Sequence, residues 1–133
     1  MTSCGTSLSV LSVAAGLLLA GCGGAGEPGP YELAPTKECL EGADLRVSDT
    51  PPEFVSSTAS GGALRVRFAD IRVTLTFGES EREAARIARA YRQFAPKKFP
   101  IDDVLRTDRN VVELWEFAPQ IEHLEILGGC LRS

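Results

Sequence analysis

One histidine and a small group of aspartates are the residues whose types could support catalysis or bind a metal. His123 is the only histidine, so a Ser-His-Asp arrangement would depend on it. No Gly-x-Ser-x-Gly turn lies near it, and we expect it on the outer side of a C-terminal helix. Asp102, Asp103 and Asp108 lack the alternate spacing, central glycine and closing glutamate of a calcium loop. We therefore expect capping and turn roles for these aspartates, with no metal site and no enzyme cofactor.

Arginines alternate with apolar residues in two consecutive segments. Residues 64–68 read Leu-Arg-Val-Arg-Phe, and residues 71–77 read Ile-Arg-Val-Thr-Leu-Thr-Phe. The apolar positions change parity at Ala69-Asp70, as a two-residue hairpin turn requires. A bulge within one long strand is the alternative, because Ala-Asp is not a favoured turn pair. In the hairpin register, Arg67 lies opposite Arg72 on the face away from the core.

This pattern predicts a polar face of the sheet that carries several arginines. Like charges on facing strands destabilise a sheet unless they are neutralised. A strand over residues 111–117 is expected to supply a carboxylate for ion pairing and an aromatic ring for stacking. The predicted patch consists of Arg46, Arg65, Arg67, Arg72, Glu113 and Trp115. It is either an internally balanced, solvated face or a binding surface for an anionic polymer, a lipid headgroup or an acidic protein. Trp115 has a second interpretation as a core residue, since Val112 and Leu114 compete for the inward direction.

A long helix is predicted over residues 80–95, where Ser80 and Glu83 form a capping box and Pro96 ends the helix. The residues expected on its inward face are Ala84, Ile87, Ala88, Tyr91, Phe94 and Ala95. A basic stripe follows another face, with Arg82, Arg86 and Arg89 at helical spacing and Arg92 nearby. This stripe is either solvated beside neighbouring glutamates or rests on anionic lipid.

The remaining elements complete an α+β fold. We expect a helix over 36–41, a strand over 44–48 and a final helix that begins near Pro119, with Ile121, Leu124 and Leu127 inward. Together these elements predict a two-layer domain, with a mainly antiparallel sheet of about four strands and helices on one face.

The N-terminal segment has the features of an export signal. Residues 8–20 are apolar and uncharged, but they are fewer than the roughly 20 residues that a transmembrane helix needs. That length suits the hydrophobic region of a secretory signal peptide. Residues 1–7 contain no Lys or Arg, which departs from the usual signal peptide, and a core helix of a cytosolic protein is the alternative.

The apolar stretch ends in Leu19-Ala20-Gly21-Cys22. These residues resemble the lipobox of bacterial lipoproteins, in which an aliphatic residue, a small residue and Gly or Ala precede the cysteine. The resemblance implies that residues 1–21 are removed and that Cys22 carries diacylglycerol. Two acyl chains hold a protein stably on a membrane without a spanning helix. The protein would then be exported and anchored to the cell membrane or outer membrane, facing the periplasm or the exterior.

The expected processing would leave two of the four cysteines unmodified in the folded domain. Cys4 would be removed and Cys22 would carry lipid, which leaves Cys39 and Cys130. Two cysteines in an oxidising compartment usually pair, although two unpaired buried thiols are the alternative. The Gly/Pro-rich residues 22–35 are expected to form a flexible tether, and residues 36–133 the folded domain.

Composition and charge narrow the class of function. A net charge of −4 gives no reason to expect a nucleic-acid partner. The favoured hypothesis is a lipid-anchored envelope module that binds an envelope protein or an anionic polymer. The alternatives are a small-ligand carrier with an apolar cavity between helices and sheet, and a small envelope hydrolase that uses two carboxylates.

The lipid anchor predicts that metabolic labelling with a fatty-acid probe marks the protein and that Cys22→Ser abolishes the label. Because the anchor would be lost, Cys22→Ser should also leave the membrane fraction. A Cys22→Ser variant that fractionates as the parent does, together with an unlabelled parent, would contradict the assignment.

Overall fold

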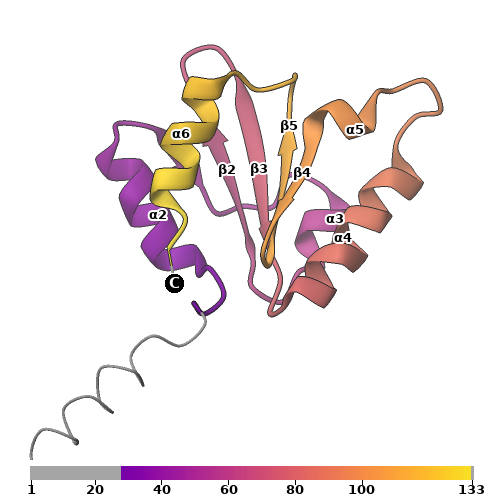
Figure 1. The fold of residues 1–133 in the computed structure, drawn as a ribbon, viewed down its shortest axis with the longest axis horizontal. Coiled ribbons are helices and arrows are strands. Elements are labelled where there is room, and N and C mark those ends of the chain that lie inside the picture. The colour runs from indigo at the N-terminus through magenta and orange to yellow at the C-terminus, as the bar shows by residue number, and fades with distance from the viewer. Residues whose placement is uncertain (1–27, 133) are drawn as a thin grey trace, which may run out of the picture.

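The computed structural model describes residues 28–132, so the expected signal peptide, Cys22 and the first part of the expected tether lie outside the described residues. Five antiparallel strands form one sheet in the order β1-β2-β3-β5-β4 (Figure 1). The strands are β1 (Arg46–Ser48), β2 (Ala63–Arg67), β3 (Arg72–Phe77), β4 (Leu105–Asp108) and β5 (Val111–Trp115). The helices are α2 (Leu33–Gly42), α3 (Phe54–Ser57), α4 (Glu81–Phe94), α5 (Ile101–Val104) and α6 (Ile121–Cys130). The predicted α+β class is confirmed, with β4, α3 and α5 added to the expected elements.

The hairpin between β2 and β3 has the predicted register. The backbone N–H of Phe68 donates to the carbonyl of Ile71 at 2.9 Å, so Ala69 and Asp70 form the turn. Arg67 pairs with Arg72, and the register continues to Ala63 opposite Thr76. The alternating apolar residues of both strands therefore lie on one face of the sheet.

That face carries the main core beneath α2 and α6. Leu64, Val66, Val73 and Leu75 are at most 2% exposed and pack with Leu40 of α2 and Leu127 of α6. Large apolar side chains thus fill the space between these helices and the sheet. Helices cover this face of the sheet, as the sequence predicts.

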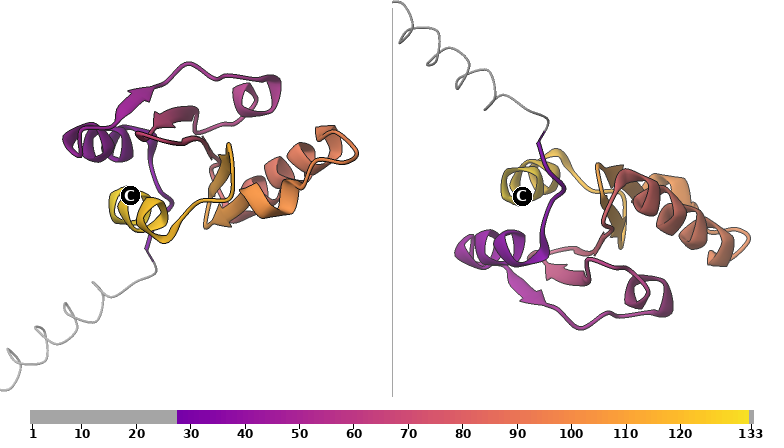
Figure 2. Two further views of the ribbon diagram at one scale, coloured as in Figure 1. Left: turned by 90° about the horizontal axis from the view of Figure 1, so that it is seen from above. Right: turned by 90° about the horizontal axis from the view of Figure 1, so that it is seen from below.

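Helix α4, which the sequence predicts over residues 80–95, lies with α5 at the far end of the opposite face, so helices lie on both faces of the sheet and not on one. Views from above and below show α2 and α6 on one side of the sheet and α4 with α5 on the other (Figure 2). Ile87 and Ala88 of α4 pack with Leu105 and Val112 of the sheet. The hydroxyl groups of Tyr91 and Thr76 lie 3.1 Å apart. One half of this face is therefore buried, and the half near the β2–β3 turn is left open.

The N-terminus of α4 is held by the side chain of Glu83. The predicted cap forms, because the hydroxyl of Ser80 accepts the N–H of Glu83 at 3.2 Å. The carboxylate of Glu83 accepts the N–H of Glu79 at 2.6 Å, instead of that of Ser80, and bonds to the N–H and hydroxyl of Ser60. Burial by itself would raise the pKa of Glu83, but the hydrogen bonds from Ser60 and Glu79 hold that pKa below its usual range.

Two predicted helix faces need correction. Phe94 was expected on the inward face of α4, yet it is 65% exposed, because it lies at the end of the helix beyond the sheet. Ile121 was expected to face inward from α6 but is 73% exposed, whereas His123 is buried. The apolar face of α6 is thus rotated from the predicted position, and Leu127 is its fully buried contact.

The folded domain begins earlier than the expected boundary at residue 36. Helix α2 starts at Leu33. Before it, Tyr31 exchanges two hydrogen bonds with the side chain of Asn110, at 2.7 and 2.9 Å, and its ring lies against Arg109. The expected tether over 22–35 is therefore too long, because its last residues are anchored to the β4–β5 turn.

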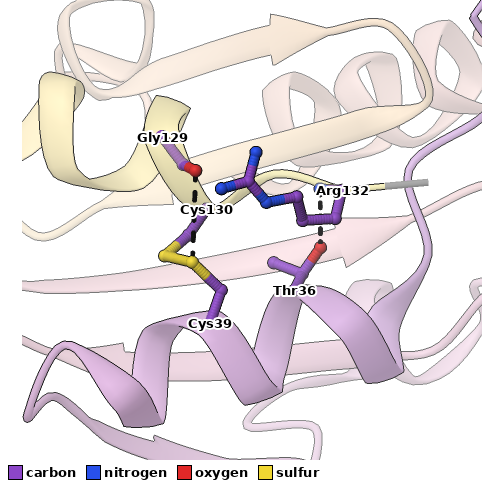
Figure 3. Close-up of a disulfide and its surroundings, with 5 residues drawn as sticks. All are labelled: Thr36, Cys39, Gly129, Cys130 and Arg132. Carbon is purple, nitrogen blue, oxygen red and sulfur yellow. Dashed lines mark hydrogen bonds between the residues drawn. A yellow bond between two sulfur atoms is a disulfide. The ribbon is translucent and has the colours of Figure 1, made fainter.

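A disulfide between Cys39 and Cys130 joins the first and last helices of the domain (Figure 3). One turn earlier on α2, the hydroxyl of Thr36 accepts the N–H of Arg132 at 3.2 Å. The N–H of Glu32 also donates to the carbonyl of Arg132 at 2.6 Å. The C-terminal residues are thereby fastened to α2 by one covalent bond and one hydrogen bond, and to Glu32, which precedes α2, by a second hydrogen bond.

We expect the Cys39→Ala/Cys130→Ala variant to be less stable than the parent. The bridge spans a sequence separation of 91, and loop-closure entropy assigns a bridge of this kind about 4–5 kcal/mol. Chemical denaturation of both proteins measures the difference. Reductant should destabilise the parent and leave the variant unchanged; equal stabilities without reductant would show that the bridge contributes little.

Glu83 predicts a pH-dependent part of the stability. Its folded-state pKa is lowered, so its contribution is present above the unfolded pKa of about 4.3 and is lost as the pH falls through the folded pKa. Glu83→Gln should reduce stability at pH 7 by about 1–3 kcal/mol, since buried donors lose a charged acceptor. Denaturant midpoints from pH 3 to 7 test this, with the exposed Glu81→Gln as control. If the denaturant midpoints of Glu83→Gln and of the parent changed with pH in parallel, the assigned role of Glu83 would be contradicted.

Candidate functional site

Three arginines lie side by side across three strands of the open half-face. Arg46 of β1 pairs with Arg67 of β2, and Arg67 pairs with Arg72 of β3. Glu116, just beyond β5, continues this row because its N–H donates to the carbonyl of Arg72 at 2.9 Å. The row therefore places three cations and one carboxylate on neighbouring strands.

The next row of the same face has a mixed character. Arg65 is flanked by Ser48 of β1 and Thr74 of β3, and Thr74 is followed by Leu114 of β5. Beyond this row, Thr76 and Val112 are buried beneath α4. Polarity thus decreases from the hairpin end of the face towards the part that α4 covers.

These two rows form the floor of an open hollow of about 520 Å³. Pro52, in the connection from β1 to α3, also lines it. Arg46, Arg67, Arg72 and Glu116 line the hairpin end, while Arg65 lies in the next row with Leu114 and the two hydroxyl residues. The lining residues in these rows are Arg46, Ser48, Arg65, Arg67, Arg72, Thr74, Leu114 and Glu116. The hollow combines a cationic end with a less polar end.

Arg72 and Glu116 form a two-point ion pair. Nη2 of Arg72 lies 2.6 Å from Oε1 of Glu116, and Nε lies 3.3 Å from Oε2. The hydrogen bonds from Arg72 lower the pKa of Glu116, and the positive charge of Arg67 lowers it further. Hydrogen bonding to Glu116 in turn raises the pKa of Arg72. Both groups are therefore charged at neutral pH.

The other three arginines are not balanced in this way. Within residues 28–132, Arg46, Arg65 and Arg67 form no ion pair within 4.0 Å. All three side chains are exposed. Facing cations at cross-strand distance repel each other, and Glu116 is the one carboxylate among the described residues that line the hollow. An anionic group placed in the hollow would relieve this repulsion.

The side chains of Glu113 and Trp115 lie on the core face of the sheet, which corrects the predicted patch, although Trp115 also borders the hollow. Both pair with the core-facing residues of β3, Glu113 with Leu75 and Trp115 with Val73. The indole N–H of Trp115 donates to Glu113 at 2.9 Å, and both residues are buried. Burial raises the pKa of Glu113, while the Trp115 hydrogen bond opposes that rise. The structure therefore brings together the four predicted arginines and replaces Glu113 with Glu116.

Sequence reasoning missed Glu116 because β5 is covered on both faces. Val111 and Val112 are each fully buried, on opposite sides of the strand. Alternation of apolar and polar residues identifies the inward face of a strand only where the other face is solvated. In β5, apolar residues occupy both odd and even positions, so the sequence could not decide which set points to the core. The strand expected over residues 111–117 includes Glu116, and this was the one sign in the sequence that Glu116 could lie beside the arginines.

His123 lies inside the fold and not on the outer side of α6. Its Nδ1 accepts the N–H of Gln120 at 3.1 Å, so the neutral ring carries its proton on Nε2, which lies 3.0 Å from Asp70 at the hairpin turn. The ring packs edge-on against Phe68, with centroids 5.2 Å apart. These contacts fasten the start of α6 to the β2–β3 turn, which is a structural role.

The three aspartates considered as metal ligands lie in separate settings. Asp102 pairs with Arg92 at 2.9 Å, and Asp108 receives a long 3.5 Å hydrogen bond from Tyr31. Asp103 lies in the first turn of α5. In the described part of the chain, no group of three or more His, Cys, Asp or Glu side chains is placed to hold a metal ion.

Comparisons with protein-family models, with curated proteins and with solved structures find no match for this chain. Among residues 28–132, no helix is both long enough and apolar enough to cross a bilayer.

Proposed function

We propose that this protein is a lipid-anchored binding module of the cell envelope. It binds an anionic group in the open hollow lined by Arg46, Arg65, Arg67 and Arg72, which we call the arginine hollow. The single observation that supports this function is the row of facing arginines with one carboxylate for several cations. A sheet gains nothing from such a row by itself. The lipobox resemblance of residues 19–22 supports the location.

The shape of the hollow favours part of a larger anion, such as an envelope polymer or an acidic segment of a protein. It is open and lies on the half of the sheet that α4 leaves uncovered. The guanidinium groups of Arg65 and Arg67 are free to form paired hydrogen bonds with phosphate or carboxylate oxygens. The Arg72–Glu116 pair supplies a fixed boundary at the β5 side of the hollow.

A small-ligand carrier is the second candidate, and the same hollow supports it. Its volume of about 520 Å³ falls within the range of small-molecule sites. The apolar cavity expected between helices and sheet is not supported, because Leu40, Phe68, Trp115 and Leu127 fill that space. A small ligand would therefore bind on the open face and would carry a negative charge.

We expect Arg65→Glu/Arg67→Glu to weaken anion binding at least roughly tenfold, since charged hydrogen bonds contribute about 1.5–3 kcal/mol each. Calorimetric titration with polyphosphate, poly-glutamate and pyrophosphate distinguishes a phosphate polymer, a carboxylate polymer and a small anion. Affinity should fall with added salt.

Arg82→Glu/Arg89→Glu is the matched control, because it reverses two exposed arginines of α4 that do not line the hollow. Thermal unfolding should show that both variants remain folded. If Arg65→Glu/Arg67→Glu binds every probe as tightly as the parent does, the hollow is not the binding site.

A further inference from the structure

The loop between α4 and α5 exposes two aromatic side chains. Phe94 ends α4 and is 65% exposed, and Phe99 precedes α5 and is 42% exposed. Residues 94–99 read Phe-Ala-Pro-Lys-Lys-Phe. Lys97 and Lys98, between the two phenylalanines, are exposed as well. We call residues 94–99 the aromatic–lysine loop.

The aromatic–lysine loop is ordered by its own backbone. The N–H of Phe99 donates to the carbonyl of Pro96 at 2.9 Å, which makes Lys97 and Lys98 the two central residues of a turn. Pro96 and Pro100 restrict the chain on both sides of that turn. Arg92 and Asp102, which pair at 2.9 Å, join the two helices at its base. The phenylalanines and lysines are therefore presented together at little cost in conformational entropy.

The position of the aromatic–lysine loop keeps it away from the core. It projects from the end of the molecule opposite α2 (Figure 1). The exposed face of α4 that leads towards it carries Arg82, Arg86 and Arg89. Within residues 28–132, neither Lys97 nor Lys98 forms an ion pair within 4.0 Å, and Asp102 of α5 is paired with Arg92. Lys97 and Lys98 therefore keep an excess of positive charge at the tip.

We propose that the aromatic–lysine loop binds an anionic lipid surface, with Phe94 and Phe99 entering the interface and Lys97 and Lys98 contacting headgroups. Aromatic side chains lower their free energy at a membrane interface, and basic residues beside them are attracted by anionic lipid. Water offers no comparable gain to the two exposed phenylalanines of one short loop. This contact is independent of the arginine hollow.

The test uses the full chain with Phe99→Trp, mixed with vesicles that contain phospholipids brominated on their acyl chains. Bromine quenches an indole that enters the bilayer, and native Trp115, which is 1% exposed in the core, gives the background measured in the parent. We expect quenching of Phe99→Trp in phosphatidylglycerol vesicles and little in phosphatidylcholine vesicles. Adding Lys97→Gln/Lys98→Gln should lower the ratio of inserted to free loop roughly thirtyfold, because the attraction of two cations to the anionic surface is lost.

Phe117→Trp is the matched control. Phe117 is 59% exposed between β5 and α6, beside Glu116 and without a lysine, so its indole should not be quenched. Phe94→Trp provides a second probe should Phe99→Trp disturb the fold, which circular dichroism would reveal. Absence of quenching at both loop positions, or equal quenching of Phe117→Trp, overturns the proposal. Concentration-dependent burial of the indole without vesicles would instead assign the aromatic–lysine loop to a second copy of the chain, and would also overturn it.

Discussion

The register of the β2–β3 hairpin is the constraint on which the rest of the structure depends. A slip of one residue in either strand would move its arginines into the core and its valines and leucines into solvent. The two-residue turn at Ala69-Asp70 fixes that register, and His123 of α6 fastens to the same turn through Asp70. One turn thereby fixes the apolar face beneath α2 and α6, the arginine face opposite it and the start of the last helix.

The second decisive feature is the partial cover of the arginine face. Helix α4 buries Thr76 and Val112 but stops short of the rows that contain Arg65 and Arg67. The apolar contacts of α4 and the hydrogen bonds of Glu83 and Tyr91 anchor this helix to one end of the sheet. The disulfide fastens α2 to α6 on the other face. Both helical layers are thus held in place while the hairpin end stays open.

The two proposed surfaces, the arginine hollow and the aromatic–lysine loop, suit two different kinds of partner. The floor of the arginine hollow is held by paired strands, and Arg72 is tied to Glu116. It suits recognition of oxygen-rich anions. The aromatic–lysine loop lies at a helix end, where apolar rings accompany the charge, and it suits a surface that has both headgroups and hydrocarbon. Both surfaces are positively charged, so charge alone does not distinguish their partners. The polar residues beside the arginines and the phenylalanines beside the lysines do.

The sequence by itself determined the α+β class and the extent of α4, because alternation, helical periodicity and caps are local signals. It also favoured the hairpin register over a bulge, and a Cys39–Cys130 bridge over unpaired thiols. Only the tertiary structure decided that Glu116 and not Glu113 accompanies the arginines, that His123 points inward and that Phe94 lies in solvent. Strand β5 is covered on both faces and α6 has apolar residues around most of its circumference, so periodicity could not orient either element. Their orientation depends on which neighbours cover them, and those neighbours are distant in sequence.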